Sequence, residues 1–326
     1  MLYPLKFRPL LKERLWGGDK LRREMGKDAP EAQLIGESWE VSGVQGDLSV
    51  VANGFLAGND LQELAEIYMG ELVGDSVYAK YGDEFPVLVK LIDAADDLSV
   101  QVHPNDQQAE MRHGAYGKTE MWYVIDAEPD AVLYVGFRHR TSREEYLRAV
   151  DEGTVAELLN RIEVKPGDAY FIPAGTIHAI GRGLLLAEIQ QTSDITYRVY
   201  DWGRTDENGQ PRELHTGLAV ETVTFGQPGG YGGYDITRRP VKNTAVEMAE
   251  SPYFTTNLLD IEGDVQRDFH LTDSFVVYVC VDGECLLRTP NGGERIRRGE
   301  TVMLPAVIDE VTLSGRARLL EVYMDI

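Results

Sequence analysis

The chain contains 326 residues, about twice a typical domain length, so we expect two domains or one enlarged domain. Its formal net charge of −22 argues against nucleic acid or an anionic membrane as a partner, because both require a positive surface, but a small anionic substrate stays open. No apolar run of about 18 residues predicts a transmembrane helix. The N-terminus is interrupted by charges and proline and does not resemble a signal peptide, so we expect a cytoplasmic protein.

Helical signals are few along the chain. Asn59 is a candidate N-cap for a helix over 60–69, where apolar residues recur at helical spacing. Two more helices are expected between residues 141 and 162, where two Thr-x-x-Glu patterns have the spacing of capping boxes: Thr141 with Glu144, and Thr154 with Glu157. These two helices would form a small insertion between strands.

Most of the remaining sequence predicts β-strands, because β-branched and aromatic runs alternate with turn residues. The expected strands cover 37–42, 85–92, 98–102, 120–125, 131–137, 184–190, 196–200, 255–261, 274–281, 284–289 and 318–323. Many short strands joined by turns are typical of a sandwich or barrel. The expected fold class is therefore all-β, with a small helical insertion.

The two cysteines, Cys280 and Cys285, flank Asp282 and Gly283 in what reads as a hairpin turn. Two cysteines do not make a disulfide framework, so we expect both thiols to be reduced.

The glycine-rich segment 228–233 is the best linker candidate and predicts two units, 1–230 and 231–326. A weak internal repeat supports this division. Residues 167–178 read GDAYFIPAGTIH and residues 299–310 read GETVMLPAVIDE, so both copies combine a Gly-acid turn, an apolar strand and Pro-Ala. The second copy has a glutamate where the first ends in histidine, so we expect the second unit to be a scaffold without a metal site.

Two of the six histidines stand in informative contexts. Gln101 and His103 alternate along one strand that ends at Pro104, so their side chains share a face at a sheet rim. His178 completes the pattern Gly-x5-Pro-x-Gly-x2-His, which matches the second metal-binding motif of cupins. Glu120 opens another predicted strand and is the best carboxylate ligand. Imidazole, carboxylate and amide groups together suit Zn²⁺, so we expect one zinc ion here.

Several segments together resemble the type I mannose-6-phosphate isomerases, in their short bacterial form. The segments are LWGG (15–18), SVQVHP (99–104), KTEMW (118–122) and SDITYR (193–198). The resemblance implies two cupin-type jelly rolls and a zinc ion bound by Gln101, His103, Glu120 and His178. It also assigns the family's catalytic and substrate-binding positions to Ser99, Lys118, Glu188, Asp194 and Arg198. The phosphate-binding lysine of the long members has no clear equivalent, and Arg204 is the candidate to replace it; Trp16 is a candidate wall of a sugar pocket.

The implied reaction interconverts mannose 6-phosphate and fructose 6-phosphate through an enediol or enediolate. Such proton transfer requires a base, for which Glu188 and Asp194 are both candidates, and positive charge near the sugar oxygens, which Lys118, Arg198 and the metal can supply. Asp194 and Arg198 could instead form a simple ion pair. Two other functions stay open: a cupin that binds metal and sugar without turnover, and an iron-dependent cupin oxygenase. The sequence predicts neither the oligomeric state nor a preference between phosphorylated and free sugars.

Overall fold

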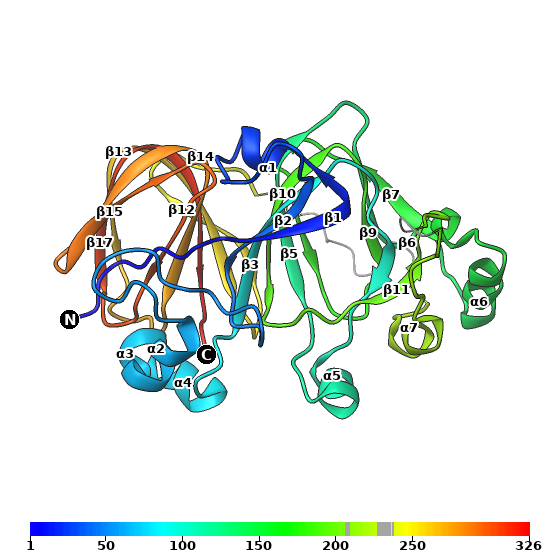
Figure 1. The fold of residues 1–326 in the computed structure, drawn as a ribbon, viewed down its shortest axis with the longest axis horizontal. Helices are drawn as coiled ribbons and strands as arrows, with labels where there is room; N and C mark the ends of the chain where they lie inside the picture. Colours follow the sequence, from blue (N-terminus) through cyan, green and yellow to red (C-terminus); the bar gives the residue numbers. More distant parts are fainter. Residues whose placement is uncertain (206–208, 227–235, 237) are drawn as a thin grey trace.

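The computed structural model describes residues 1–205, 209–226, 236 and 238–326, and these residues form mainly antiparallel β-sheets (Figure 1). Two sheets face each other and form what we call the first barrel. The larger has the order β1-β2-β3-β10-β5-β8 and the smaller β11-β4-β9-β6-β7. Their bounds are β1 Leu10–Gly18, β2 Ile35–Val41, β3 Val87–Ala94, β4 Val100–Val102, β5 Glu120–Ala127, β6 Val132–Phe137, β7 Leu159–Glu163, β8 Ala169–Ile172, β9 His178–Ile180, β10 Leu184–Gln191 and β11 Tyr197–Tyr200.

A third sheet, with the order β12-β13-β17-β14-β15 and β16 paired to β14, forms the second barrel. Its bounds are β12 Ala245–Glu250, β13 Thr255–Asp268, β14 Val276–Thr289, β15 Gly292–Arg297, β16 Thr301–Leu304 and β17 Glu310–Tyr323. The second barrel lies beside the first in Figure 1. The predicted linker at 228–233 falls outside the described residues, and the division into 1–230 and 231–326 stays a prediction.

The larger sheet of the first barrel carries buried apolar side chains on both faces. Ile92 and Leu186 enter a core that the two sheets of the first barrel share. Their strand neighbours Leu91 and Ala187 point the other way and join a core that includes residues of the second barrel, such as Leu258. Because side chains alternate along a strand, these runs read as continuous apolar sequence rather than as an apolar-polar alternation. The larger sheet is thus packed between the smaller sheet and the second barrel.

The chain's N-terminus crosses to the second barrel before it enters the first. Leu5 is fully buried and pairs with Met303 through two backbone hydrogen bonds of 2.8 and 2.9 Å. Leu2 and Phe7 are buried in the same core. The N-terminal segment therefore stabilises the contact between the two barrels.

Helices cover the ends and the outer face of the barrels. They are α1 Lys20–Arg23, α2 Leu61–Tyr68, α3 Gly70–Val73, α4 Asp75–Tyr81, α5 Asp106–His113, α6 Arg143–Asp151 and α7 Thr216–Thr222, with one 3₁₀ turn at Val155–Leu158. The predicted helix at 60–69 is confirmed, but its N-cap is Asp60 rather than Asn59. The first insertion helix is also present, and its cap is Ser142 rather than Thr141.

The second predicted insertion helix is wrong. After the 3₁₀ turn, residues Leu159–Glu163 form strand β7, which pairs with β6 at the edge of the smaller sheet. Thr154 precedes the turn without a capping hydrogen bond from its side chain. Pairing with an available sheet edge overrides the weak local helix signal here.

The internal repeat is confirmed as a structural repeat. In the first copy, strand β8 is followed by β9, which begins at His178. In the second copy, β16 is followed by β17, which begins at Glu310, the position equivalent to His178. The expected hairpin at Cys280 and Cys285 is wrong, because β14 is one continuous strand with a bulge there; both thiols are free, as expected.

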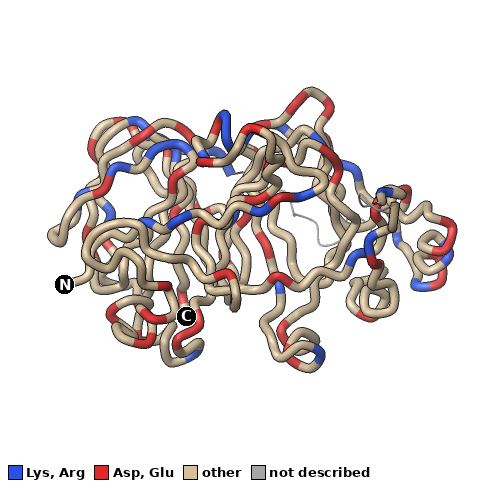
Figure 2. The backbone as a smooth tube through the Cα atoms, in the orientation of Figure 1, with Lys and Arg blue, Asp and Glu red and all other residues tan. Residues whose placement is uncertain are grey.

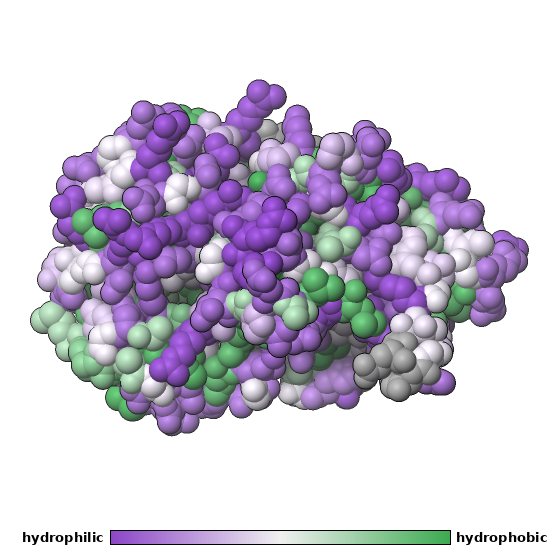
Figure 3. Space-filling model, turned by 45° about the horizontal axis from the view of Figure 1, so that its top comes forward, coloured by the Kyte–Doolittle hydropathy of each residue, from purple (hydrophilic) through white to green (hydrophobic). Residues whose placement is uncertain are grey.

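Charged residues of both signs are interspersed over the surface segments (Figure 2), and the face shown in Figure 3 is predominantly hydrophilic. Within the described residues, none of the helices has the length and apolar character needed to cross a bilayer.

Candidate active site

The four predicted metal ligands come together at one end of the first barrel. Gln101 on β4 lies directly opposite His178, the first residue of β9. His103 follows β4, and Glu120 opens β5 in the facing sheet. Gly175 connects the segment before His178 to the segment that carries His103, because its backbone N–H donates to the His103 carbonyl at 2.9 Å. Its φ of +84° is a conformation that favours glycine.

His103, Glu120 and His178 form a compact, fully buried cluster. Their potential ligand atoms all lie within 4.8 Å of one another, and it is the one such cluster that the described part of the chain contains. His103 Nε2 is 3.2 Å from one Glu120 oxygen, and His178 Nε2 is 3.8 Å from the other. These separations leave space for one ion between the three side chains.

Backbone carbonyls fix the orientation of both imidazoles. His103 Nδ1 lies 2.8 Å from the carbonyl oxygen of Ile195, and His178 Nδ1 lies 2.9 Å from that of Thr176. A carbonyl can only accept, so each Nδ1 carries the proton and each Nε2 presents a lone pair to the cluster. A hydrogen bond at the second ring nitrogen is the usual support of a metal-bound histidine.

The electrostatics of the cluster favour the protonation states that bind a metal. Burial and the neighbouring Lys118 ammonium lower the pKa of His103 to about 4, and burial lowers the pKa of His178. Burial alone would raise the pKa of Glu120, yet Lys118, 2.9 Å away, holds that pKa well below its usual range. At neutral pH the cluster therefore has two neutral imidazoles and one carboxylate, the forms that coordinate a cation.

The donor set fits a divalent ion for a further reason. Both oxygens of Glu120 are buried; one forms an ion pair with Lys118 at 2.9 Å, and the other accepts no hydrogen bond from the described residues. Leaving a buried carboxylate in this state is costly, and a bound cation would relieve the cost. The Gln101 amide lies 3.4 Å from His178 Nε2, and a turn of this amide would present its oxygen as a fourth ligand.

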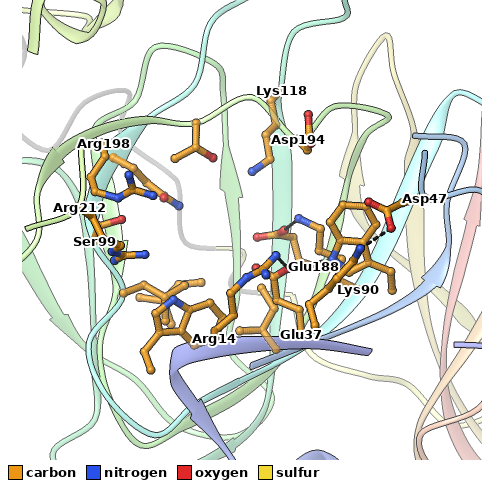
Figure 4. Close-up of a pocket in the computed structure, with 18 residues that line it drawn as sticks. Arg14, Glu37, Asp47, Lys90, Ser99, Lys118, Glu188, Asp194, Arg198 and Arg212 are labelled. Carbon is orange, nitrogen blue, oxygen red and sulfur yellow. Dashed lines mark hydrogen bonds and ion pairs between the residues drawn. The ribbon is translucent and has the colours of Figure 1, made fainter. Parts of the chain in front are cut away.

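A cavity of about 600 Å³ opens beside the cluster (Figure 4). Six of the predicted catalytic and substrate-binding residues line it, together with the metal-ligand candidate Gln101: Trp16, Ser99, Lys118, Glu188, Asp194 and Arg198. Arg204 does not line it, because its guanidinium binds Asp201 at 2.6 Å and the carbonyl of Asp97. Arg212, which the sequence reasoning missed, lines the cavity instead.

A row of polar and aromatic side chains crosses the larger sheet beneath this cavity. Trp39, Lys90, Glu188 and Trp122 are successive cross-strand partners on β2, β3, β10 and β5. Lys90 donates to one oxygen of Glu188 at 2.9 Å, and the Trp122 indole donates to the other at 2.9 Å. Both oxygens of Glu188 are thus hydrogen-bonded, which makes it a poor candidate for a free base.

Asp194 has the opposite environment. Its carboxylate is exposed to the cavity and makes neither a hydrogen bond nor an ion pair with any residue that the structure describes. The alternative of an ion pair between Asp194 and Arg198 is therefore not supported, although Figure 4 shows both beside the cavity.

Positive charge is concentrated at the Arg198 end of the cavity. The other lining cations are each paired with a carboxylate: Lys12 with Asp47, Arg14 with Glu37, Lys90 with Glu188 and Lys118 with Glu120. Asp201, a single carboxylate, pairs with both Arg204 and Arg212.

Arg198 itself has no carboxylate partner in the described chain. It donates to the Glu213 carbonyl at 2.9 Å, and its buried Nε has no acceptor there. Burial and the charge of Arg212 lower its pKa. Within the described residues, this end of the cavity therefore has an excess of positive charge, in a protein with a formal net charge of −22.

Sequence reasoning missed several cavity residues: Lys12, Arg14, Glu37, Trp39, Lys90 and Arg212. A lysine inside the otherwise apolar segment 85–92 was the one available signal for Lys90, because a buried lysine requires a partner. The others become cavity residues only through cross-strand pairing and long-range contacts.

The fold and the donor set define a cupin-type protein with a His-Glu-His cluster that could hold a metal ion, beside a polar, partly cationic cavity. Residues 5–133 match the family model for the phosphomannose isomerase type I catalytic domain, and residues 244–324 match the mannose-6-phosphate isomerase cupin domain. The chain belongs to the type I phosphomannose isomerase family.

Relatives extend this similarity over the whole chain. Mannose-6-phosphate isomerase ManA of Bacillus subtilis is 36% identical over 319 residues, which is 96% of each chain. The mannose-6-phosphate isomerase of Streptococcus mutans is 35% identical and covers 97% of this chain and 96% of its own. The crystal structure of the mannose 6-phosphate isomerase from Bacillus subtilis aligns with a TM-score of 0.85 at 34% identity, over 98% of this chain and 99% of that one. The expected all-β fold with two cupin-type units is confirmed.

Proposed function

We propose that this protein interconverts mannose 6-phosphate and fructose 6-phosphate with one bound divalent cation, which we take to be zinc. The observation that carries the proposal is the joining of two features in one cavity. A buried His-Glu-His cluster, in which one carboxylate oxygen has no hydrogen-bond donor among the described residues, adjoins a binding space whose Arg198 end has excess positive charge within the described chain. A metal binder needs no such charged end, and an oxygenase needs no such set of cations and carboxylates around its metal.

The phosphate group is placed at the Arg198 end. A phosphate dianion requires cations and donors that are not already neutralised by carboxylates. Among the described residues, the buried Nε of Arg198 has no acceptor, and Arg212 shares the carboxylate of Asp201 with Arg204. Ser99 and Thr196 line the same cavity and can donate hydroxyl hydrogen bonds. Arg204 contributes to this charge through Asp201, rather than by direct contact.

Asp194 is the base that we assign to the proton transfer between C1 and C2. A general base must have a free lone pair within reach of the substrate. Asp194 meets this condition because it lines the cavity and its carboxylate has no partner among the described residues, whereas Glu188 is held by Lys90 and Trp122. Glu188 then serves to hold Lys90, whose ammonium lies in the floor of the cavity.

Zinc, when bound by Gln101, His103, Glu120 and His178, would supply a Lewis acid for the sugar oxygens. Lys118 lies against this cluster and lines the cavity, so its ammonium can donate a hydrogen bond to an oxygen that becomes negative in the enediolate. Trp16 is buried and presents an apolar wall to the sugar.

The direct test is conversion of fructose 6-phosphate by the purified protein, with mannose 6-phosphate detected by a coupled assay. We expect turnover, its loss on chelation, and its recovery on adding zinc. Glu120→Gln is the matched variant: it keeps the size of the side chain, removes the anionic ligand, and should lose metal and activity together. Metal binding without turnover by the wild-type protein would instead support a binding protein.

A further inference from the structure

Strand β10 ends in two adjacent buried glutamines, of which Gln190 lies beside the candidate active site. In register, Gln190 is the cross-strand partner of Glu120, and it follows Glu188 on the same face of the strand. Gln190 does not line the cavity, and its side chain is completely shielded from solvent. A buried amide at this position needs an explanation, because each unsatisfied polar atom would destabilise the fold.

The amide of Gln190 is hydrogen-bonded on both sides. Its oxygen accepts from Lys90 Nζ at 2.6 Å. Its nitrogen donates to the backbone carbonyls of Gln191 at 2.7 Å and Ser193 at 2.6 Å. These partners fix the amide in one orientation, since the ammonium can only donate and the carbonyls can only accept.

The partners of Gln190 belong to two separate parts of the site. Lys90 lies on β3, in the floor of the cavity, where it also binds Glu188. Ser193 lies in the turn after β10 and immediately precedes Asp194. The next residue, Ile195, provides the carbonyl that orients His103. One side chain thus connects the floor of the cavity to the turn that carries the proposed base.

We infer that Gln190 is a positioning residue that holds the Lys90 ammonium and the Asp194 turn at a fixed separation. This inference rests on the proposed function, because it gives Lys90 and Asp194 their places around the sugar. Gln190 itself touches no substrate. Gln190 affects the rate through two other residues. The Lys90 ammonium on the sheet and the Asp194 carboxylate on the turn must both face the same substrate carbons, and small displacements of such groups lower the rate steeply.

Other residues would not replace this glutamine. Methionine has a similar length but loses all three hydrogen bonds. Glutamate keeps an acceptor for Lys90 but places a carboxylate oxygen against the two carbonyl oxygens, which repels the turn. The pair Gln190→Met and Gln190→Glu therefore separates the two contacts of the amide.

The experiment compares these variants with wild type for kcat, KM, bound metal and thermal stability, using mannose 6-phosphate and zinc-loaded protein. We expect each variant to lower kcat at least about tenfold, with KM changed by less than about threefold and metal content unchanged. The matched control is Asn257→Leu in the second barrel, which removes another buried amide that donates to Glu321 at 2.9 Å. We expect Asn257→Leu to lower the melting temperature by about as much as the Gln190 variants do, and to leave kcat unchanged.

Each contrary result has a distinct meaning. A Gln190→Met variant with kcat within about threefold of wild type would overturn the inference, as would a loss of kcat that follows loss of metal. Full kcat in Gln190→Glu would contradict the claim that Gln190 holds the Asp194 turn. If Asn257→Leu lost as much kcat as the Gln190 variants, general destabilisation would explain the loss and the inference would be wrong. An inactive wild-type protein would instead refute the proposed function.

Discussion

Replacing Arg198 by alanine tests where the phosphate group binds. The guanidinium of Arg198 has no carboxylate partner in the described chain, its Nε is buried without an acceptor, and the charge of Arg212 lies close by. A phosphate dianion at this place would complete an arrangement that is otherwise electrostatically unbalanced. The substitution therefore removes a charge that forms no ion pair within the described chain and that donates one hydrogen bond, to the Glu213 carbonyl.

The expected loss follows from the charge and the partial burial. At an effective dielectric constant of about 20, two unit charges about 4 Å apart interact by about 4 kcal/mol. Arg198 is only half-buried, so we reduce this value to about 3 kcal/mol, which corresponds to about a hundredfold in kcat/KM. The metal content should not change, because Arg198 does not contact the His-Glu-His cluster.

The assay is steady-state isomerisation of mannose 6-phosphate by wild type, Arg198→Ala and Arg198→Lys. The lysine variant keeps the charge but loses the planar guanidinium, so it should retain part of the activity. Arg161→Ala is the matched control: its side chain is exposed on β7 and pairs only with Glu163, so its kcat/KM should equal that of wild type. Near wild-type efficiency in Arg198→Ala would refute the placement of the phosphate.

Four more outcomes are expected. His178→Ala should lose the bound metal in elemental analysis, because it removes one of three buried ligands; full metal content would contradict the site. The protein should bind one metal ion per chain, and a second ion bound by residues beyond 240 would show that the C-terminal barrel is not a metal-free scaffold. Asp194→Asn should lower kcat at least about a hundredfold and abolish exchange of the substrate C2 proton with deuterated solvent, while metal is retained; continued exchange would assign the base elsewhere. Leu5→Ala should lower the free energy of unfolding by about 2–5 kcal/mol in denaturant titration, because Leu5 is fully buried between the barrels; a change below about 0.5 kcal/mol would mean that the N-terminal segment does not stabilise the barrel contact.

The metal cluster could be predicted from sequence because its signals are local. Gln101 lies on a short strand and His103 directly follows it, and His178 follows a turn in which Gly175 has a positive φ. Such spacing depends on strand alternation and turn chemistry, which hold wherever the segments lie in the fold. The resemblance of four short segments to one family then specified the partners of the cluster.

Local signals were less reliable for the helices. Two caps were predicted one residue too early, at Asn59 and Thr141, because several neighbouring residues can serve as caps. The segment after Thr154 has a capping pattern but forms β7, since an open sheet edge offered better pairing. Local propensity is a weak preference that tertiary contacts can reverse.

The sequence by itself determined the β-rich fold class, the structural repeat and the residues of the His-Glu-His cluster. Only the tertiary structure decided how the charges of the cavity are paired. Lys90 forms an ion pair with Glu188, 98 residues away in the sequence, and Arg212 shares Asp201 with Arg204, so that Arg198 has no carboxylate partner in the described part of the chain. These pairings distinguish the free carboxylate of Asp194 from the occupied one of Glu188, which look alike in the sequence. Cross-strand register and long-range contacts determine which charges meet, and neither can be deduced from the spacing of residues within a single segment.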